Sequence, residues 1–420
     1  MSLHKKIEQM LKLSRQASSK LGVLSSEEKN SVLKDMADCL RQDTNLILSA
    51  NAKDMSMAIK KKMPASLVDR LTLNEKRIAQ MVDSLEALIK LDDPVGQVLK
   101  TENRPNGLKI EKVRVPIGVI FIIYESRPNV TSDCAGLCFK SGNAVILRGG
   151  SESFCSNAAI LKSLKRALEK HNLPASCVNM VDTTDRRAVD ILLKAAGQID
   201  LVIPRGGESL IKKVVETSRI PVIKHYKGIC HVYVDEEADL NMAESICFNA
   251  KVQRPGVCNA METMLVHRDA AARFIPGMAK RLIDAGVQIR GCALTRRIAR
   301  NLKVKSATDK DYHTEYLGLI LSVKVVDSLY DAIQHINHYG SGHSDAIITD
   351  NYNNSEVFLK EVDSACVYVN ASTRFTDGYQ FGMGAEIGIS TDKIHARGPM
   401  ALEELTSYKY QVYGNGQIRN

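Results

Sequence analysis

The sequence predicts an α/β protein in which strands and helices alternate over most of the chain. Continuous apolar runs such as residues 116–124 (PIGVIFIIY) are typical of strands buried on both faces of a parallel sheet. Such runs are repeatedly followed by segments with the apolar spacing of a helix. With 420 residues, 44% of them hydrophobic and 25% charged, the chain is long enough for two or three domains with their own cores.

The composition argues against several classes of protein. The first residues lack the apolar core of a signal peptide, and no apolar window reaches the length of a membrane span, so we expect a soluble, cytoplasmic protein without a membrane partner. The ten cysteines show no CxxC or Cys/His zinc spacing, which suits a reducing compartment and predicts no metal site. The net charge of +9 is spread along the chain without interleaved aromatic residues. A solvated surface is the first interpretation of this charge and anionic small-molecule ligands are the second, and we expect no nucleic-acid partner.

The chain begins with helices and continues into an extended arm. Residues 3–90 have helical spacing, whereas 98–115 is an extended stretch, joined through the turn Pro105-Asn106-Gly107, in which polar and apolar residues alternate over 108–115. This pattern predicts a hairpin with one exposed face. The tail, residues 405–412, alternates in the same way and is expected to pair with the hairpin. Because such an arm has little core of its own, we expect it to pack against another subunit.

The apolar run at 116–124 opens a first α/β domain. Further strands are expected at 144–147, 177–181, 200–203 and 222–223, and helices at 131–140, 153–171, 185–196 and 208–217. The pairs Gly149-Gly150 and Gly206-Gly207 each lie between a strand and a helix, where an open α/β sheet binds nucleotide phosphates. Neither has GxGxxG spacing, and glycine is common in such turns, so a phosphate contact and a purely structural turn both remain open.

A second α/β domain follows and contains the most reactive candidate side chain. Its strands are expected at 231–234, 263–266, 319–326, 346–349 and 367–370, with a helix at 238–250. Cys258 lies in the segment KVQRPGVCNAMETMLVH, residues 251–267, just after the turn Pro255-Gly256. Arg254 favours a thiolate nearby, which predicts a nucleophile facing a cleft between the two domains. A buried structural cysteine is the alternative, because free cysteine is among the most buried residue types.

Several longer motifs resemble those of the glutamate-5-semialdehyde dehydrogenases, also called γ-glutamyl phosphate reductases, in the aldehyde dehydrogenase superfamily. These motifs are IYESRPNV (123–130), KSGNAVILRGG (140–150), DLVIPRGG (200–207), RPGVCNAMET (254–263), SGHSDAIIT (341–349) and VNASTRFTDGYQFGMGAEIGISTDKIHARGP (369–399). The resemblance implies an aldehyde-dehydrogenase-like α/β fold in three parts. These are a Rossmann-type NADPH-binding domain (1–98 and 116–230), an α/β catalytic domain (231–402) and a small β oligomerisation arm (99–115 and 403–420).

The resemblance also implies a reaction. It is the NADPH-dependent reduction of L-glutamyl 5-phosphate to L-glutamate 5-semialdehyde, with release of phosphate, through a thioester on Cys258, in proline biosynthesis. The implied assembly is a homo-oligomer built on a dimer, and glutamate 5-kinase is a candidate partner that supplies the labile substrate. Two alternatives remain: an oxidising aldehyde dehydrogenase acting on another small aldehyde, and a basic scaffold that binds an anionic partner.

The same resemblance implies roles for particular residues. The catalytic set is Cys258 with Ser126 and Asn129 as candidate oxyanion donors; the cofactor set is Lys140, Arg148, Gly149, Gly206, Gly207 and Glu315; the substrate set is Arg127, Asn259, Arg374 and His395. Glu386, Lys393 and Arg397 are further candidates for the substrate's charged groups. An arginine at position 148, where the superfamily has a lysine, fits the 2′-phosphate of NADPH.

One expectation rests on a missing carboxylate. Superfamily members that hydrolyse their thioester carry a glutamate just before a Gly-Gly pair, but the matching stretch here, VIKHYKGICHVYVD (222–235), has no acid before Gly228. Some related reductases have Gly-His-Ala-Asp-Gly there; this chain keeps His225 and Gly228 and departs at Lys224, Tyr226 and Lys227. The sequence therefore predicts an acyl-enzyme that waits for phosphate and not for water.

Overall fold

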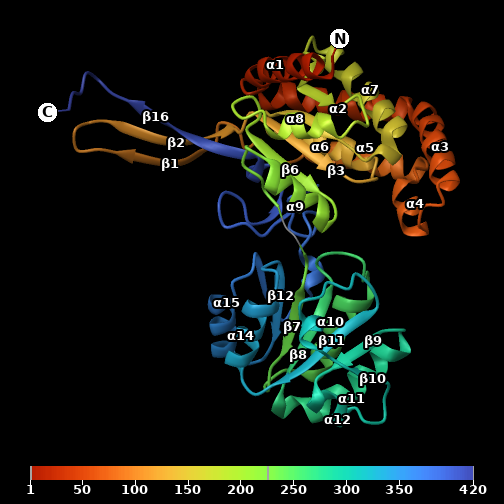
Figure 1. Cartoon of the computed structure of the whole chain (residues 1–420). Helices are drawn as coiled ribbons and strands as arrows, with labels where there is room; N and C mark the ends of the chain where they lie inside the picture. The colour runs from red at the N-terminus through yellow and green to blue at the C-terminus, as the bar shows by residue number, and fades with distance from the viewer. Residues whose placement is uncertain (1, 225–226, 420) are drawn as a thin grey trace. The chain divides into compact units, whose positions relative to one another are not determined.

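The structure, a computed structural model, describes residues 2–224 and 227–419 and divides into two compact units (Figure 1). The first unit comprises Met1–Lys224, Gly382–Gly388 and Met400–Asn420, and the second comprises His225–Phe381 and Ile389–Pro399. The sequence predicted residues 231–402 as one continuous domain, whereas the segment Gly382–Gly388 belongs to the first unit.

Five helices open the first unit, as the spacing of residues 3–90 predicts. They are α1 (Leu3–Leu21), α2 (Ser26–Gln42), α3 (Thr44–Lys60), α4 (Ala65–Leu71) and α5 (Glu75–Ile89). Ser25 starts α2 with a capping box, because its side chain accepts from the Glu28 N–H while the Glu28 carboxylate accepts from the Ser25 N–H. Ser2 and Asn74 cap α1 and α5 by single side-chain bonds.

The sheet of the first unit is parallel and four-stranded. Its order is β5 (Val178–Met180), β4 (Ala144–Arg148), β3 (Val119–Tyr124) and β6 (Leu201–Arg205). The helices that connect or follow these strands are α6 (Asn129–Lys140), α7 (Phe154–Lys170), α8 (Arg187–Leu193) and α9 (Glu208–Thr217). All residues of β3 and β4 are buried, which explains their unbroken apolar runs. The strand predicted at residues 222–223 is wrong: only a single bridge joins Val222 to Val202.

Chain direction places the connecting helices on both faces of this sheet. The chain steps from β3 to β4 to β5 through α6 and α7, and then returns past β3 to β6 through α8. Right-handed crossovers therefore put α6 and α7 on one face and α8 on the other, where it contacts α1. The loops after β3, β4 and β6 meet at the carboxyl edge of the sheet.

The arm is a three-stranded antiparallel sheet with β2 (Lys109–Pro116) between β1 (Val98–Asn103) and β16 (Thr406–Tyr413) (Figure 1). The predicted pairing of the tail with the hairpin is confirmed, with Ser407 opposite Val115 and Val412 opposite Ile110. Every residue of β1 is exposed. The hairpin forms without a core of its own, because alternating residues and a Gly-containing turn define it.

The second unit is built on a parallel sheet of seven strands. Its order is β10 (Val304–Ser306), β9 (Gln288–Gly291), β11 (Ile320–Val326), β8 (Met261–His267), β7 (Cys230–Val234), β12 (Ser344–Ile348) and β13 (Cys366–Val369). Its helices are α10 (Leu240–Val252), α11 (Arg268–Asp284), α12 (Ala293–Ile298), α13 (Asp309–Tyr312), α14 (Leu329–Tyr339) and α15 (Tyr352–Glu361). Two short strands, β14 (Gly388–Ser390) and β15 (Gly398–Met400), form a separate sheet.

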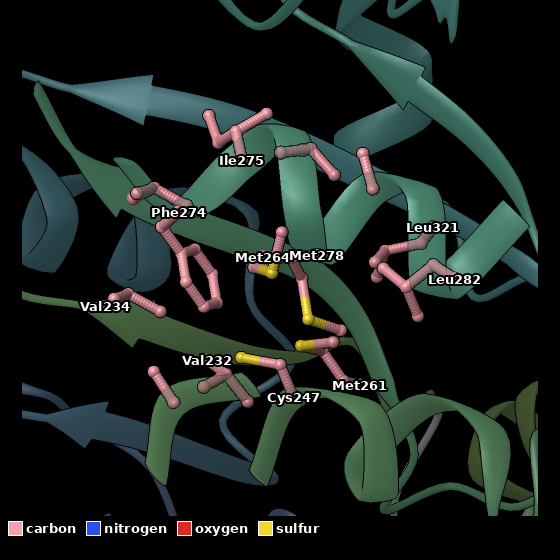
Figure 2. Close-up of a cluster of buried hydrophobic side chains, with 14 of the residues drawn as sticks. Val232, Val234, Cys247, Met261, Met264, Phe274, Ile275, Met278, Leu282 and Leu321 are labelled. Carbon is pink, nitrogen blue, oxygen red and sulfur yellow. The ribbon is translucent and has the colours of Figure 1, made fainter. Parts of the chain in front are cut away.

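The second unit has a core on each face of its sheet. On one face Val232 and Val234 of β7 and Met264 of β8 meet Phe274 and Met278 of α11 (Figure 2). On the other face Tyr233, the residue between the two valines, joins a cluster with residues of α14 and α15. Side chains that alternate across the strand explain why β7 is buried along its whole length. In the described part of the chain, no helix combines the length and the hydropathy that crossing a bilayer requires.

His335 is a titratable side chain buried in the second unit. Its ring packs against those of Tyr312 and Tyr339, at centroid distances of 5.0 and 4.4 Å, and its Nδ1 accepts from Lys324 Nζ at 3.1 Å. Burial lowers the pKa of His335 to about 2, and the nearby basic groups act in the same direction; these are His231, Lys324, His338 and His313. The folded protein therefore holds His335 neutral, whereas an unfolded chain protonates it below roughly pH 6.5.

This difference predicts a loss of stability in acid. Because the unfolded state binds the extra proton, the contribution of a neutral His335 is present above roughly pH 6.5 and is lost as the pH falls toward the folded-state pKa. In the wild type, His335 lowers the free energy of unfolding by up to about 1.4 kcal/mol for each pH unit below about pH 6.5. We expect His335→Gln to abolish this part of the pH dependence, measured by urea unfolding between about pH 6.5 and pH 5. The control is His338→Gln, an exposed histidine on the same helix, which should keep most of the wild-type slope. Equal slopes for His335→Gln and the wild type would contradict the expectation.

Candidate active site

Cys258, the predicted nucleophile, lies on a tight loop that joins α10 to the amino end of β8. This loop, residues 253–260, is called the nucleophile loop below. The loop closes with a backbone hydrogen bond of 3.1 Å from Ala260 N–H to the Val257 carbonyl. Asn259 and Ala260 are buried, while Cys258 is half-buried. Of the ten cysteines, only Cys258, Cys155 and Cys292 are not fully buried. The loop thus anchors its end in the core and leaves the Cys258 thiol partly accessible.

The backbone just before β7 packs directly against the nucleophile loop. A Cβ atom on Gly228 would lie 1.9 Å from the Cys258 carbonyl oxygen, so only glycine fits there. The same oxygen accepts a hydrogen bond of 3.2 Å from Cys230 Sγ. Burial raises the pKa of the Cys230 thiol well above its ordinary value, and Asp345 and Cys258 raise it further. Cys230 is therefore a protonated donor that holds the loop, and it is not the reactive thiol.

Arg374 supplies positive charge to the loop. Its Nε donates to Gln253 Oε1 at 2.9 Å, and its Nη1 contacts Asn259 Oδ1. Burial lowers the pKa of Arg374, and Arg254 lowers it further, whereas Cys258 acts in the opposite direction. Two guanidinium groups thus lie within electrostatic range of one another, and one of them also interacts with Cys258. This environment favours a thiolate.

Asn259, which was predicted to bind the substrate, makes its hydrogen bonds within the protein. Its Nδ2 donates to the Thr376 carbonyl at 2.8 Å and to the Arg374 carbonyl at 3.4 Å, and its own carbonyl accepts from Thr373 Oγ1 at 2.8 Å. With Oδ1 in contact with Arg374, the polar groups of this buried side chain are engaged within the protein. The structure assigns Asn259 to holding the nucleophile loop against residues 372–376 and gives no support to a substrate contact.

Glu315 belongs to the same cluster at the amino edge of the second sheet. Its Oε1 accepts from the Gly228 N–H at 2.9 Å, so this carboxylate fixes the backbone on which the nucleophile loop rests. In the stretch before Gly228, the departures Lys224 and Lys227 are half-buried, whereas the retained His225 and the departure Tyr226 lie outside the described residues.

The loop after β3 in the first unit carries the other predicted catalytic donors. Ser126 is buried and donates to Glu152 Oε2 at 3.1 Å. Arg127 and Asn129 are exposed, and Asn129 Nδ2 donates to Asp133 Oδ2 at 3.0 Å. The three side chains therefore stand at one carboxyl edge of the sheet, and Asn129 begins α6.

The glycine pairs have a packing reason at that edge. A Cβ on Gly149 would lie 2.1 Å from Asn157 Nδ2, and a Cβ on Gly206 would lie 2.8 Å from Glu125 Oε1. Gly207 N–H, at the start of α9, already donates to Glu125 Oε1 at 2.8 Å. A larger residue at position 149 or 206 would thus have to displace the Asn157 or the Glu125 side chain.

Arg148 and Lys140, both predicted to meet the cofactor, lie in different surroundings. Arg148 ends β4 at the carboxyl edge, where its guanidinium contacts the Gly149 and Thr184 carbonyls. Its buried Nε has no hydrogen-bond partner among the described residues, and burial lowers its pKa. Lys140 instead ends α6, at the opposite end of the helix from that edge, and its Nζ donates to Asn30 Oδ1 at 2.5 Å. Its fully buried position gives no support to a cofactor contact.

The C-terminal motif is only partly available to a substrate. Lys393 and Arg397 both pair with Asp363, and their charges lower its pKa. His395 is exposed and adopts a positive φ of 72°. Glu386 belongs to the first unit. Lys393 and Arg397 therefore hold the segment against residue 363.

A buried ion pair that the sequence did not predict flanks the nucleophile loop. Lys251 Nζ and Glu262 Oε2 are 2.6 Å apart, and both side chains are fully buried. Among the described residues, Glu236, His267 and Asp269 also gather ligand atoms within 4.8 Å, but two of the three are exposed. No sequence pattern linked Lys251 to Glu262, because one ends a helix and the other lies in a strand.

Comparison with known proteins defines the class. Residues 2–289 and 302–410 match the model of the aldehyde dehydrogenase family. The γ-glutamyl phosphate reductase of Thermodesulfovibrio yellowstonii is 55% identical over 408 residues, 97% of each chain. That of Thermoanaerobacter pseudethanolicus is 56% identical over 413 residues, 98% of this chain and 99% of the relative. The crystal structure of γ-glutamyl phosphate reductase from Thermotoga maritima is 47% identical, covers 99% of this chain and 100% of its own, and has a TM-score of 0.96.

The chain belongs to the aldehyde dehydrogenase family and is an enzyme with that family's α/β fold. Within the family, its resemblance to the γ-glutamyl phosphate reductases, which the motifs indicated, is confirmed over nearly the whole chain.

The contact between Gly228 and Cys258 gives a direct prediction. Gly228→Ala would place a methyl group against the Cys258 carbonyl, so the loop or β7 must shift. We expect dehydrogenase turnover to fall about 100-fold, since a displacement of about 1 Å at a catalytic group has that effect. Unfolding free energy should fall by about 1–3 kcal/mol.

Gly256→Ala is the matched control within the same loop. The nearest atom to a Cβ there is the Leu317 carbonyl oxygen at 3.7 Å, an ordinary contact, so turnover and stability should change little. Wild-type turnover in Gly228→Ala, measured with NADP and an aldehyde substrate, would show that the close approach has no catalytic consequence.

Proposed function

We propose that the chain catalyses the NADPH-dependent reduction of L-glutamyl 5-phosphate to L-glutamate 5-semialdehyde, with release of phosphate, in proline biosynthesis. The observation that carries the proposal is Cys258, a half-buried thiol on a rigid loop with the Arg374 guanidinium beside it. The names of relatives at about 55% identity supply the substrate. Because acyl phosphates are labile, we include glutamate 5-kinase as a proposed partner that delivers the substrate.

In the proposed reaction the Cys258 thiolate attacks the acyl carbon of the substrate. The bond from that carbon to the phosphate oxygen breaks, phosphate leaves, and a thioester remains on Cys258. NADPH, when bound, supplies the hydride that reduces the thioester. Release of the aldehyde then returns the thiolate to Cys258.

The roles of the other residues follow from their surroundings. The Cys258 N–H is a proposed oxyanion donor, with Ser126 or Asn129 as the donor from the loop after β3, and each donor of this kind is worth about 3 kcal/mol. Arg374, Arg127 and His395 are the proposed ligands of the substrate's anionic groups.

The proposed cofactor set is Arg148, Gly149, Gly206, Gly207 and Glu315. Arg148 fits an anionic group such as the 2′-phosphate of NADPH, because its guanidinium is buried and its Nε has no protein partner among the described residues. Arg186 lies within electrostatic range of Arg148 and adds positive charge. Lys140 is not retained in this set.

Phosphate dependence distinguishes the proposal from an oxidising aldehyde dehydrogenase. We expect oxidation of the semialdehyde with NADP to stop after about one turnover without phosphate and to continue with it, because a thioester needs an acceptor. Cys258→Ser should lower steady turnover by about 1000-fold or more. The same assay with NAD tests the assigned cofactor. Steady turnover that releases glutamate in phosphate-free buffer would favour the oxidising enzyme, and an active Cys258→Ser would exclude the thiol mechanism.

The arm supports a proposed homo-oligomer built on a dimer. Tyr408, Tyr410 and Val412 alternate along β16, so they share one face, and each is at least half exposed. β1 and β16 both present unpaired strand edges. Exposed apolar side chains and open edges of this kind are typical of an interface.

Charged residues on that face should weaken the assembly. We expect Tyr410→Glu together with Val412→Glu to lower the mass measured by light scattering at micromolar concentration, because two carboxylates would be buried without partners. Lys409→Glu, an exposed position on the opposite face of the same strand and paired with Val113, is the control and should leave the mass unchanged. A monomeric wild type would show that the arm has another purpose.

A further inference from the structure

The nucleophile loop is closed at its base by a buried ion pair. Lys251 lies in the last turn of α10, and Glu262 is the second residue of β8, so the pair joins the two ends of the segment that carries Cys258. Lys251 Nζ and Glu262 Oε2 are 2.6 Å apart, and neither side chain has exposed surface. The distance between them sets the width of the loop's base.

Stability alone does not explain this pair. Removing two charges from water costs several kcal/mol per ion, and apolar residues of similar volume are often at least as stabilising. Burial raises the pKa of Glu262 to about 7 and lowers the pKa of Lys251, while each partner opposes the shift of the other. A costly pair at the base of the reactive loop therefore points to a requirement for a defined position.

Glu262 also connects the loop to a second segment of the site. Its Oε1 accepts from the Leu317 N–H at 3.0 Å, and Leu317 adopts a left-handed φ of 51° that a leucine rarely takes. Two residues earlier, Glu315 accepts from the Gly228 N–H, and Gly228 packs on the Cys258 carbonyl. Glu262 thus connects the base of the nucleophile loop to residues 315–317. That segment is connected in turn, through Glu315 and Gly228, to the Cys258 carbonyl.

We propose that Lys251 and Glu262 are positioning residues, and that their ion pair fixes the Cys258 loop and the Glu315 segment relative to each other. The proposal rests on the proposed role of Cys258 as the nucleophile. Neither residue touches the substrate or the cofactor in this assignment. Their effect passes through the loop that holds the thiol and through the backbone bonded to Glu315.

The test uses the double variant Lys251→Met, Glu262→Gln. It removes both charges without leaving one unpaired, and glutamine keeps an acceptor for the Leu317 N–H. A purely structural pair predicts that the double variant has a lower melting temperature than the wild type but the same kcat per folded molecule. The proposal predicts a melting temperature near that of the wild type, a kcat lowered by about tenfold or more, and a smaller change in KM.

Alkylation of Cys258 by iodoacetamide, followed by mass spectrometry of its peptide, reports on the loop without any turnover. In the double variant the pH midpoint of Cys258 alkylation should rise, because the thiol is no longer held beside Arg374. Cys292, a half-buried thiol of the same unit whose hydrogen bonds involve Thr295 and Val325, is the internal control and should be unchanged. Wild-type kcat and an unshifted Cys258 midpoint would overturn the proposal.

Two further variants complete the design. Arg281→Met with Glu244→Gln removes a partly exposed ion pair of the same unit and should leave kcat and both alkylation profiles unchanged. If the double variant Lys251→Met, Glu262→Gln does not fold, Lys251→Gln with Glu262→Gln decides, because it removes both charges and leaves two amide side chains that can hydrogen-bond to each other; an unchanged kcat there would also overturn the proposal. Failure of the thiol mechanism is separate, since it would be seen as activity in Cys258→Ser.

Discussion

The close approach of the Gly228 backbone to the Cys258 carbonyl is the constraint on which the candidate site depends. It requires the start of β7 and the loop before β8 to lie in contact, and the neighbouring order of those strands in the sheet provides this. Cys230 and Glu315 then have defined partners, the Cys258 carbonyl and the Gly228 N–H. The missing side chain of Gly228 thus allows two donors and two acceptors to form a single arrangement at the amino edge of the second sheet.

Much of the fold is visible in the sequence, and what is missing has local causes. β3 and β4 were predicted because burial on both faces leaves unbroken apolar runs, and the arm because exposure on one face leaves alternation. The elements between residues 268 and 312 were not predicted. There α11 keeps helical spacing in its buried residues but contains Pro276, which argues against a helix, while β9 and β10 are strands of only four and three residues.

The site divides in the same way. Cys258 was found from a local turn and a nearby arginine, both readable in a few residues. Asn259 follows it directly, yet its partners come from residues 373–376, which the fold brings back from more than a hundred positions away. Lys140 belongs to a motif that resembles the family, but its place at the end of α6 buries it beside Asn30. A motif identifies residues that occur together, and only the path of the chain decides which of them reach the reacting groups.

The environment of each cysteine decides which thiol can react. Cys230 and Cys258 both lie at the same carbonyl oxygen, one as its hydrogen-bond donor and the other as the residue that carries it. Full burial raises the pKa of Cys230, as it does for Cys138, so these thiols keep their protons. Cys258 is only half-buried and interacts electrostatically with Arg374. Contacts with Gln253 and Asn259 offset the cost of desolvating the Arg374 guanidinium. Partial exposure beside a positive charge is the environment of a reactive thiol, and Cys258 meets both conditions, which is why it is the proposed nucleophile.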